Sequence, residues 1–210
     1  MSVSKSPFVL IEDFVSPLLC EEIVDSCLIE VPDTDENHKP IMSVRFNRLA
    51  ELRLGESINE ILIPELEQYY DFEYKGMHPF EIEFYPQGCK NNKQRCENSV
   101  FVATKGKKSW HRTSSKDFCC VLFLKDYRDK KPLDPYYEVM GGKLQFLNHN
   151  FSINPKRGTL VVFPGEEHFI NYTSDILYGD LHQVRFYIAA TKPYIYDKSK
   201  FPGDYTTWFK

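Results

Sequence analysis

The sequence has little that would point to a membrane protein or to a general nucleic-acid binder. No stretch approaches the roughly 18 consecutive apolar residues of a membrane-spanning helix, and residues 1–14 lack the long apolar segment of a secretory signal peptide. Basic residues are not in excess, because 26 Lys and Arg stand against 30 Asp and Glu, for a net charge of −4. We therefore expect an intracellular protein without a membrane or nucleic-acid partner.

The sequence also lacks the cysteine spacing of a zinc site. Its six cysteines, at positions 20, 27, 89, 96, 119 and 120, match no CxxC pattern. Cys119 and Cys120 are adjacent in an apolar run, where neighbouring side chains of a strand point to opposite faces and do not pair. We interpret the cysteines as small buried residues in a reducing compartment.

The N-terminal part of the chain predicts helices. Residues 8–11 read as a short strand, and Ser16 and Pro17 then fit the N-cap and the first position of a helix. A second helical stretch covers residues 54–72, where Pro64 predicts a kink or a break.

After Met77 the pattern changes to short strands. Residues 80–86 (FEIEFYP) alternate, whereas residues 118–127 (FCCVLFLKDY) form the continuous apolar run that is typical of a strand covered on both faces. The segments KLQFL, GTLVVFP and QVRFYIAAT follow, separated by Gly, Pro and Asn. Helices first and strands later predict an α+β fold, a jelly roll backed by N-terminal helices.

The C-terminal residues differ from the rest. We place one jelly-roll domain at residues 1–192 and an aromatic tail without a clean period at residues 193–210. The aromatic side chains of the tail predict packing, either on its own domain or as an arm on a partner subunit.

Several motifs together resemble the prolyl-4-hydroxylase-like 2-oxoglutarate/Fe(II) oxygenases, of the type found in phages and aquatic bacteria. The motifs are GGKLQFLNHNFSINPKRGTLVVFP at residues 141–164, FLKDY at 123–127 and VLIEDFVSPLLCEEIV at 9–24, and the similarity spans residues 8–190. The resemblance implies a double-stranded β-helix. It also implies Fe(II) held by a His-x-Asp/Glu motif and a distal histidine, with a basic residue of the last strand on the far carboxylate of 2-oxoglutarate.

The first metal motif can be placed in two ways. If it is HRT, His111 is the ligand, 26 residues after Tyr85, and the carboxylate is missing. If it is RCENS, ten residues after Tyr85, the spacing resembles that of the family, and the stretch that follows aligns without gaps. We prefer the second placement, in which Arg95 stands at the histidine position and Glu97 at the carboxylate position.

The second half of the implied site also differs from the family pattern. The distal histidine of the family often lies seven residues after the FP motif, and that position is Asn171. The usual continuation then puts Leu181 at the co-substrate position. A shorter turn would instead offer His168, and Arg185 lies four residues after Leu181, on the same face of a strand.

The preferred alignment predicts a degenerate site. Arg95 carries a fixed positive charge and only donates hydrogen bonds, and a leucine cannot bind a carboxylate. We therefore expect a non-catalytic protein without a cofactor. It would act as a binding or structural module with protein partners in a larger assembly, for example in the neck or tail of a phage virion. The alternative is an active hydroxylase with Fe(II) and 2-oxoglutarate, which uses His111, His168 and Arg185.

A basic segment remains outside these motifs. Six Lys and Arg lie between residues 90 and 108. This segment is interpreted as a solvated loop, or as a surface for an acidic partner or a phosphate backbone.

Overall fold

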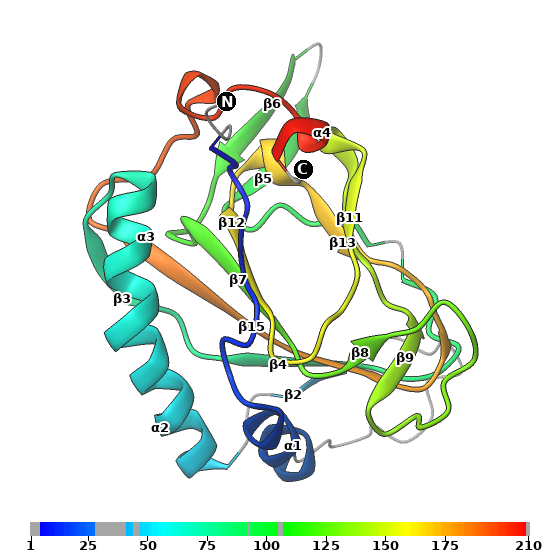
Figure 1. The fold of residues 1–210 in the computed structure, drawn as a ribbon. Coiled ribbons are helices and arrows are strands. Elements are labelled where there is room, and N and C mark those ends of the chain that lie inside the picture. The colour runs from blue at the N-terminus through cyan, green and yellow to red at the C-terminus, as the bar shows by residue number, and fades with distance from the viewer. Residues whose placement is uncertain (1–4, 28–40, 44–46, 92, 105–106, 209–210) are drawn as a thin grey trace.

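The computed structural model describes residues 5–27, 41–43, 47–91, 93–104 and 107–208, with the backbone alone described at 41–43. Four α-helices and one π-helical turn lie in these ranges. They are α1 (Pro17–Ser26), α2 (Arg48–Ser57), the π-helical turn η1 (Ile58–Leu62), α3 (Ile63–Tyr70) and the short α4 (Tyr205–Trp208). Figure 1 shows α2 and α3 along one side of the molecule, with α4 apart from them near β11.

The strands form one large sheet and three small ones. The large sheet has the order β1-β12-β7-β15-β4-β2, with β3 also on β15. Its strands are β1 (Val9–Ile11), β2 (Ile41–Ser43), β3 (Tyr74–Met77), β4 (Glu81–Tyr85), β7 (Phe118–Phe123), β12 (Leu160–Pro164) and β15 (Leu181–Ala190).

The small sheets complete the jelly roll. One has the order β11-β10-β13, with β10 (Leu144–Phe146), β11 (Phe151–Ile153) and β13 (Asn171–Thr173). Another has the order β14-β9-β8, with β8 (Asp126–Tyr127), β9 (Glu138–Gly141) and β14 (Ile176–Tyr178). The third is a ribbon of β5 (Ser99–Thr104) and β6 (Lys107–Arg112), so the C-terminal part of the predicted basic loop belongs to a β-ribbon.

The helix predictions are confirmed with one difference. Ser16 caps α1, because its Oγ accepts a hydrogen bond from Leu19 N at 3.2 Å, and Pro17 takes the first position. Pro64 does not break the second helix, because α2, η1 and α3 follow one another without a gap. The distortion lies in the wide π turn before the proline, which spreads the backbone where the ring would otherwise crowd the carbonyl of residue 60.

Strand β7 explains the continuous apolar run of the sequence. Phe118, Cys120 and Leu122 face the helices and belong to the larger core cluster. Cys119, Val121 and Phe123 point the other way and pack between the two facing sheets. Both faces are therefore covered, as the sequence predicted, and the fold is α+β with helices behind one sheet.

The aromatic tail packs on its own domain. Tyr194 and Phe201 are buried in the cluster that contains Tyr70 and Phe118, and Trp208 is buried in the cluster between the sheets. The side chains that suggested a partner-packing arm are thus used within the chain, while the division at residue 192 stays a prediction.

None of the helices in the described ranges combines the length and the apolar character that crossing a membrane requires.

Candidate functional site

The candidate site lies where β4, β13, β15 and the segment around Arg95 meet. Arg95 and Asn171 form an isolated antiparallel bridge, with Arg95 N donating to Asn171 O at 2.9 Å and Asn171 N to Arg95 O at 3.0 Å. In the large sheet, Gln183 lies opposite Glu83. Residues that are far apart in the sequence are therefore brought together by strand register, and Arg95, Glu97 and Asn171 do converge.

Two arginines and two glutamates form a buried charge cluster, which we call the Arg–Glu cluster (Arg95, Arg185, Glu83 and Glu97). Arg95 pairs with Glu83. Arg185 reaches both carboxylates, with Nε 3.3 Å from Glu83 Oε2 and Nη1 2.9 Å from Glu97 Oε1. The formal charges of the cluster sum to zero.

Neutral polar groups add further hydrogen bonds around the cluster. Glu83 Oε2 accepts from Tyr85 Oη at 3.0 Å and from Gln183 Nε2 at 2.5 Å. Glu97 Oε1 also accepts from Asn171 Nδ2 at 3.3 Å. Arg185 Nη1 lies 3.0 Å from Cys119 Sγ.

Burial makes these interactions strong. The side chains of Arg185 and Glu83 are 0% and 1% exposed, and that of Glu97 is 5% exposed. Burial alone would raise the pKa of Glu83, but the charges of Arg185 and Arg95 outweigh it and lower this pKa to about 2. Glu83 is therefore ionised throughout the physiological range.

These residues do not match a facial triad for Fe(II). Arg95 and Asn171 are the residues that the sequence motifs predict at the two histidine positions, and Glu97 is already engaged by Arg185 and Asn171. A guanidinium beside the carboxylate repels a divalent cation and offers it no lone pair. Within the described ranges, no group of three His, Cys, Asp or Glu side chains could hold a metal ion.

The two histidines of the alternative site have surroundings different from those of the cluster. His111 is exposed on β6, with Nε2 2.9 Å from Ser109 Oγ. His168 lies in the short 3-10 helix η3 (Glu167–Phe169), where its side chain is 58% exposed and Nδ1 is 3.9 Å from Glu166 Oε1. Of the three alternative residues, Arg185 is the one that the fold brings to the cluster.

The predicted co-substrate position has an apolar environment. Leu181 is fully buried in a small cluster with Tyr85, Cys89, Val139 and Ile176. Leu181 therefore makes aliphatic contacts at this position. It lies on the same strand as Arg185, four residues earlier.

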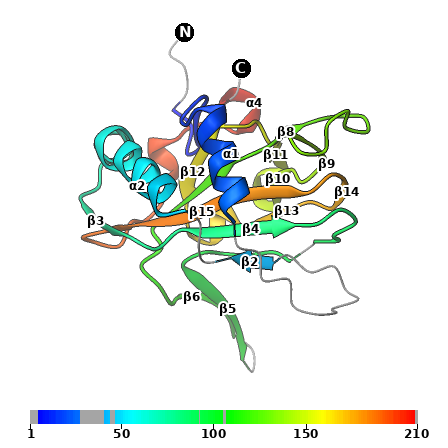
Figure 2. The ribbon, with the colours of Figure 1, turned by 90° about the horizontal axis from the view of Figure 1, so that it is seen from below.

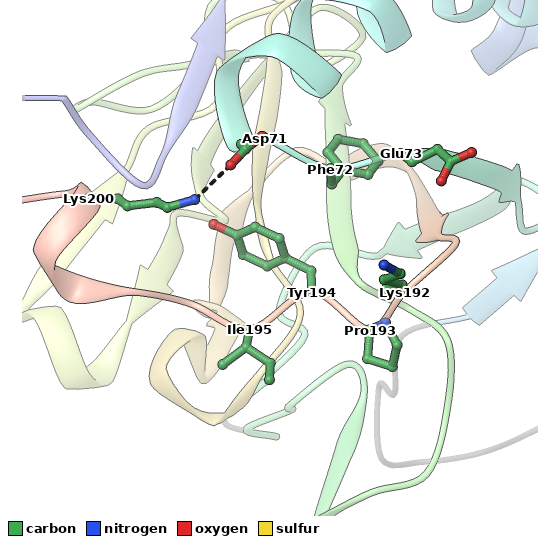
Figure 3. A pocket seen from close by; sticks show the side chains of 8 residues that line it. All are labelled: Asp71, Phe72, Glu73, Lys192, Pro193, Tyr194, Ile195 and Lys200. Atoms are coloured by element: carbon green, nitrogen blue, oxygen red, sulfur yellow. Dashed lines mark hydrogen bonds and ion pairs between the residues drawn. The ribbon is translucent and has the colours of Figure 1, made fainter.

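One cleft lies elsewhere on the molecule. It has a volume of about 490 Å³ and lies between the end of α3 and the tail, where Lys200 Nζ pairs with Asp71 Oδ2 at 3.0 Å beside Tyr194 (Figure 3). None of the predicted site residues lines it. The Arg–Glu cluster is thus a filled core position rather than an open pocket.

Sequence reasoning missed Glu83, Gln183 and Tyr85 as members of the cluster. The signal that was available is the alternation of FEIEFYP, which puts Glu83 and Tyr85 on one face of β4. An acidic residue on a strand that also contributes buried apolar side chains indicates a buried partner of opposite charge.

Comparison with solved structures defines the class of fold: it is that of the prolyl-4-hydroxylase-like 2-oxoglutarate/Fe(II) oxygenases, as the sequence motifs predicted. A viral collagen prolyl hydroxylase from Paramecium bursaria Chlorella virus-1, in a 2OG complex, matches with a TM-score of 0.63 and 13% identity, over 91% of this chain and 100% of that one. A Pseudomonas putida prolyl-4-hydroxylase matches with a TM-score of 0.62 and 14% identity, over 89% and 94% of the two chains.

A third structure has a peptide bound. It is a Trichoplax adhaerens prolyl hydroxylase in complex with a hypoxia inducible factor oxygen degradation domain peptide fragment, with a TM-score of 0.60 and 12% identity, over 88% of this chain and 84% of that one. No protein-family model and no curated protein sequence matches the chain.

These structures correct one expectation. The sequence led us to expect a protein without a cofactor, but the structures that share the fold are prolyl hydroxylases, and one of them was solved as a 2OG complex. The prediction of no cofactor is therefore wrong. It was drawn from lost ligand positions alone, and such positions say nothing of the co-substrate chemistry of the fold.

Proposed function

We propose that this chain uses the oxygenase fold as a binding or structural module and does not catalyse hydroxylation at the family's metal position. The observation that carries the proposal is the pair of guanidinium groups around the buried carboxylates of Glu83 and Glu97, that of Arg185 fully buried and that of Arg95 21% exposed. A centre that activates oxygen needs neutral imidazoles and open coordination positions, which this arrangement does not offer.

The cluster has a structural use in place of a catalytic one. It joins β4, β15, β13 and the segment of Arg95 through charged hydrogen bonds in the interior. Buried ion pairs of this kind fix the relative position of the groups that they connect, because separating them leaves a buried charge unpaired. We infer that the cluster holds the two sheets in register.

The setting of such a module is a larger protein assembly. The resemblance to phage-type oxygenases supports a virion component, such as a neck or tail protein, by analogy of fold. The six cysteines are all free thiols, which supports a reducing, intracellular compartment for synthesis.

Turnover of 2-oxoglutarate tests the proposal. The purified full chain is mixed with Fe(II), ascorbate, 2-oxoglutarate and a proline-rich peptide, and succinate is quantified beside a prolyl hydroxylase as positive control. We expect succinate at the level of the protein-free blank. Enzyme-dependent succinate over many turnovers would refute a non-catalytic role.

The competing function is a prolyl hydroxylase with an atypical site of His111, His168 and Arg185. The fold match to prolyl hydroxylases favours it, as does Arg185 Nη2, a buried donor without a hydrogen-bond partner in the described part of the chain. An anaerobic Fe(II)/2-oxoglutarate absorption band at 1:1 stoichiometry that is lost in His111→Ala and His168→Ala would establish it. A band that survives both substitutions would exclude these two histidines as ligands.

A further inference from the structure

The β5–β6 ribbon extends away from the body of the molecule (Figure 2). Ser99 is its one buried residue among those described, and Val100 and Phe101 are 48% and 51% exposed. A two-stranded ribbon is marginally stable alone, so this ribbon exposes large apolar side chains on an element that gains from a partner surface.

One face of the ribbon combines aromatic and basic character. Phe101 lies directly opposite Trp110, with ring centroids 5.3 Å apart. Lys108 is two residues from Trp110, so it is on the same face, and Lys107 is on the other. The sequence from Ser99 to Arg112 contains no acidic residue. A complementary surface would therefore be apolar and acidic.

Such a surface exists on helix α2 of the same chain. A groove of about 320 Å³ lies along α2, lined by Arg48, Glu51, Leu52, Gly55, Glu56, Asn59 and Phe80. Leu52 is 52% exposed. The charged residues of the groove are two Glu and one Arg, so it has a net negative charge.

Gly55 keeps this groove open. A Cβ at this position would meet no atom within 4 Å, so the packing of the chain itself does not require a glycine there. Glycine in a helix interior is less favourable than alanine by about 1 kcal/mol. The packing of the chain itself gives no reason for the less favourable glycine at position 55. This indicates that the space over α2 is occupied by another surface.

We propose that the ribbon of one copy of this chain docks in the α2 groove of a second copy. Phe101 and Trp110 would cover Leu52 and Gly55, and Lys108 would face Glu51 and Glu56. Figures 1 and 2 both place the ribbon and α2 on different sides of the molecule, so the contact is made between chains.

The two surfaces are different, so the contact is heterologous and builds rings or open filaments. The inference names a partner for the proposed structural module, and it rests on that proposal for its biological use. The assembly itself is tested separately from hydroxylation, because it is read from mass and not from succinate.

Sedimentation velocity over a concentration series tests the contact, with Gly55→Phe to fill the groove and Gly55→Ala as the matched control. The parent chain and Gly55→Ala are expected to form species larger than a monomer, weakened by added salt because of the lysine–glutamate contacts. Gly55→Phe and a Phe101→Ser/Trp110→Ser variant are each expected to be folded monomers by circular dichroism.

Mixing the two monomeric variants is the decisive experiment for the contact between ribbon and groove. The first variant retains an intact ribbon and the second an intact groove, so the mixture is expected to give a species of two chains that grows no further. A parent chain that is monomeric at all concentrations would overturn the proposal, whether or not the ribbon binds another macromolecule. So would oligomers that persist in both variants.

Discussion

At the scale of residues, the account depends on a few buried charges. Arg185 is the central one, because it contacts both Glu83 and Glu97 and is itself fully buried. Removing one partner of a buried pair leaves the other charge without compensation. This destabilises the folded state more than replacing both partners by apolar residues. The cluster is therefore the place where single substitutions should have the largest effects.

Arg185→Met tests this directly. We expect a loss of about 3–5 kcal/mol in the free energy of unfolding, because two carboxylates then lack their shared guanidinium. The measurement is urea denaturation followed by circular dichroism. The control is Arg53→Ala, which removes a 2.8 Å pair with Glu22 at the surface and should change stability by less than about 1 kcal/mol. Losses of equal size in the two variants would contradict a buried, coupled cluster.

Glu166 gives a pH-dependent prediction. Burial raises its pKa to about 7, while its Oε1 accepts a hydrogen bond from Tyr196 N at 2.8 Å. Because the pKa of Glu166 in the folded protein lies above its ordinary value of 4.5, the folded protein favours the protonated form. This contribution to stability is fully present below pH 4.5 and is lost as the pH rises through 7.

Glu166→Gln should therefore stabilise the protein at pH 8 by about 1 kcal/mol, after allowance for solvent screening, and should have no effect at pH 4. Thermal unfolding of parent and variant at both pH values gives the difference, in which other titrating groups cancel. A difference that is independent of pH would show that the carboxyl of Glu166 is not held in an unfavourable charged state.

At the scale of elements, local patterns were sufficient for some predictions and not for others. The cap at Ser16 and the buried run of β7 depend on neighbours in sequence, and both were predicted. Glu83 was missed because its role depends on the pairing of β4 with β15, which joins residues 100 positions apart. Arg95 and Asn171 could be aligned only through a family resemblance, since nothing local indicates that they form a bridge.

The tail offers the element-scale test. Phe201 is fully buried against Tyr69, Tyr70 and Tyr196, so Phe201→Ala should cost about 3–5 kcal/mol. Ile195 lies in the same segment but is 76% exposed, and Ile195→Ala should change stability by less than about 0.5 kcal/mol. Differential scanning calorimetry of the two variants makes the comparison. If Phe201→Ala is as mild as Ile195→Ala, the tail is not part of the core.

At the scale of the whole molecule, similarity of fold does not imply the same chemistry at the expected metal position. The chain keeps the arrangement of sheets found in prolyl hydroxylases at 12–14% identity, while its charges at the expected metal position are arranged for mutual compensation. Fold similarity carries the architecture, and the function has to be argued from the side chains that fill the site.

Reconstruction of the facial triad tests the central claim, that Arg95, Glu97 and Asn171 occupy the metal position of the fold. Arg95→His/Asn171→His with Glu97 retained should bind Co(II) at 1:1 stoichiometry at least about tenfold more tightly than the parent chain, as followed by visible absorption and calorimetry. Adding Glu97→Gln should remove that gain. An affinity equal to that of the parent, or one that is indifferent to Glu97, would contradict the account.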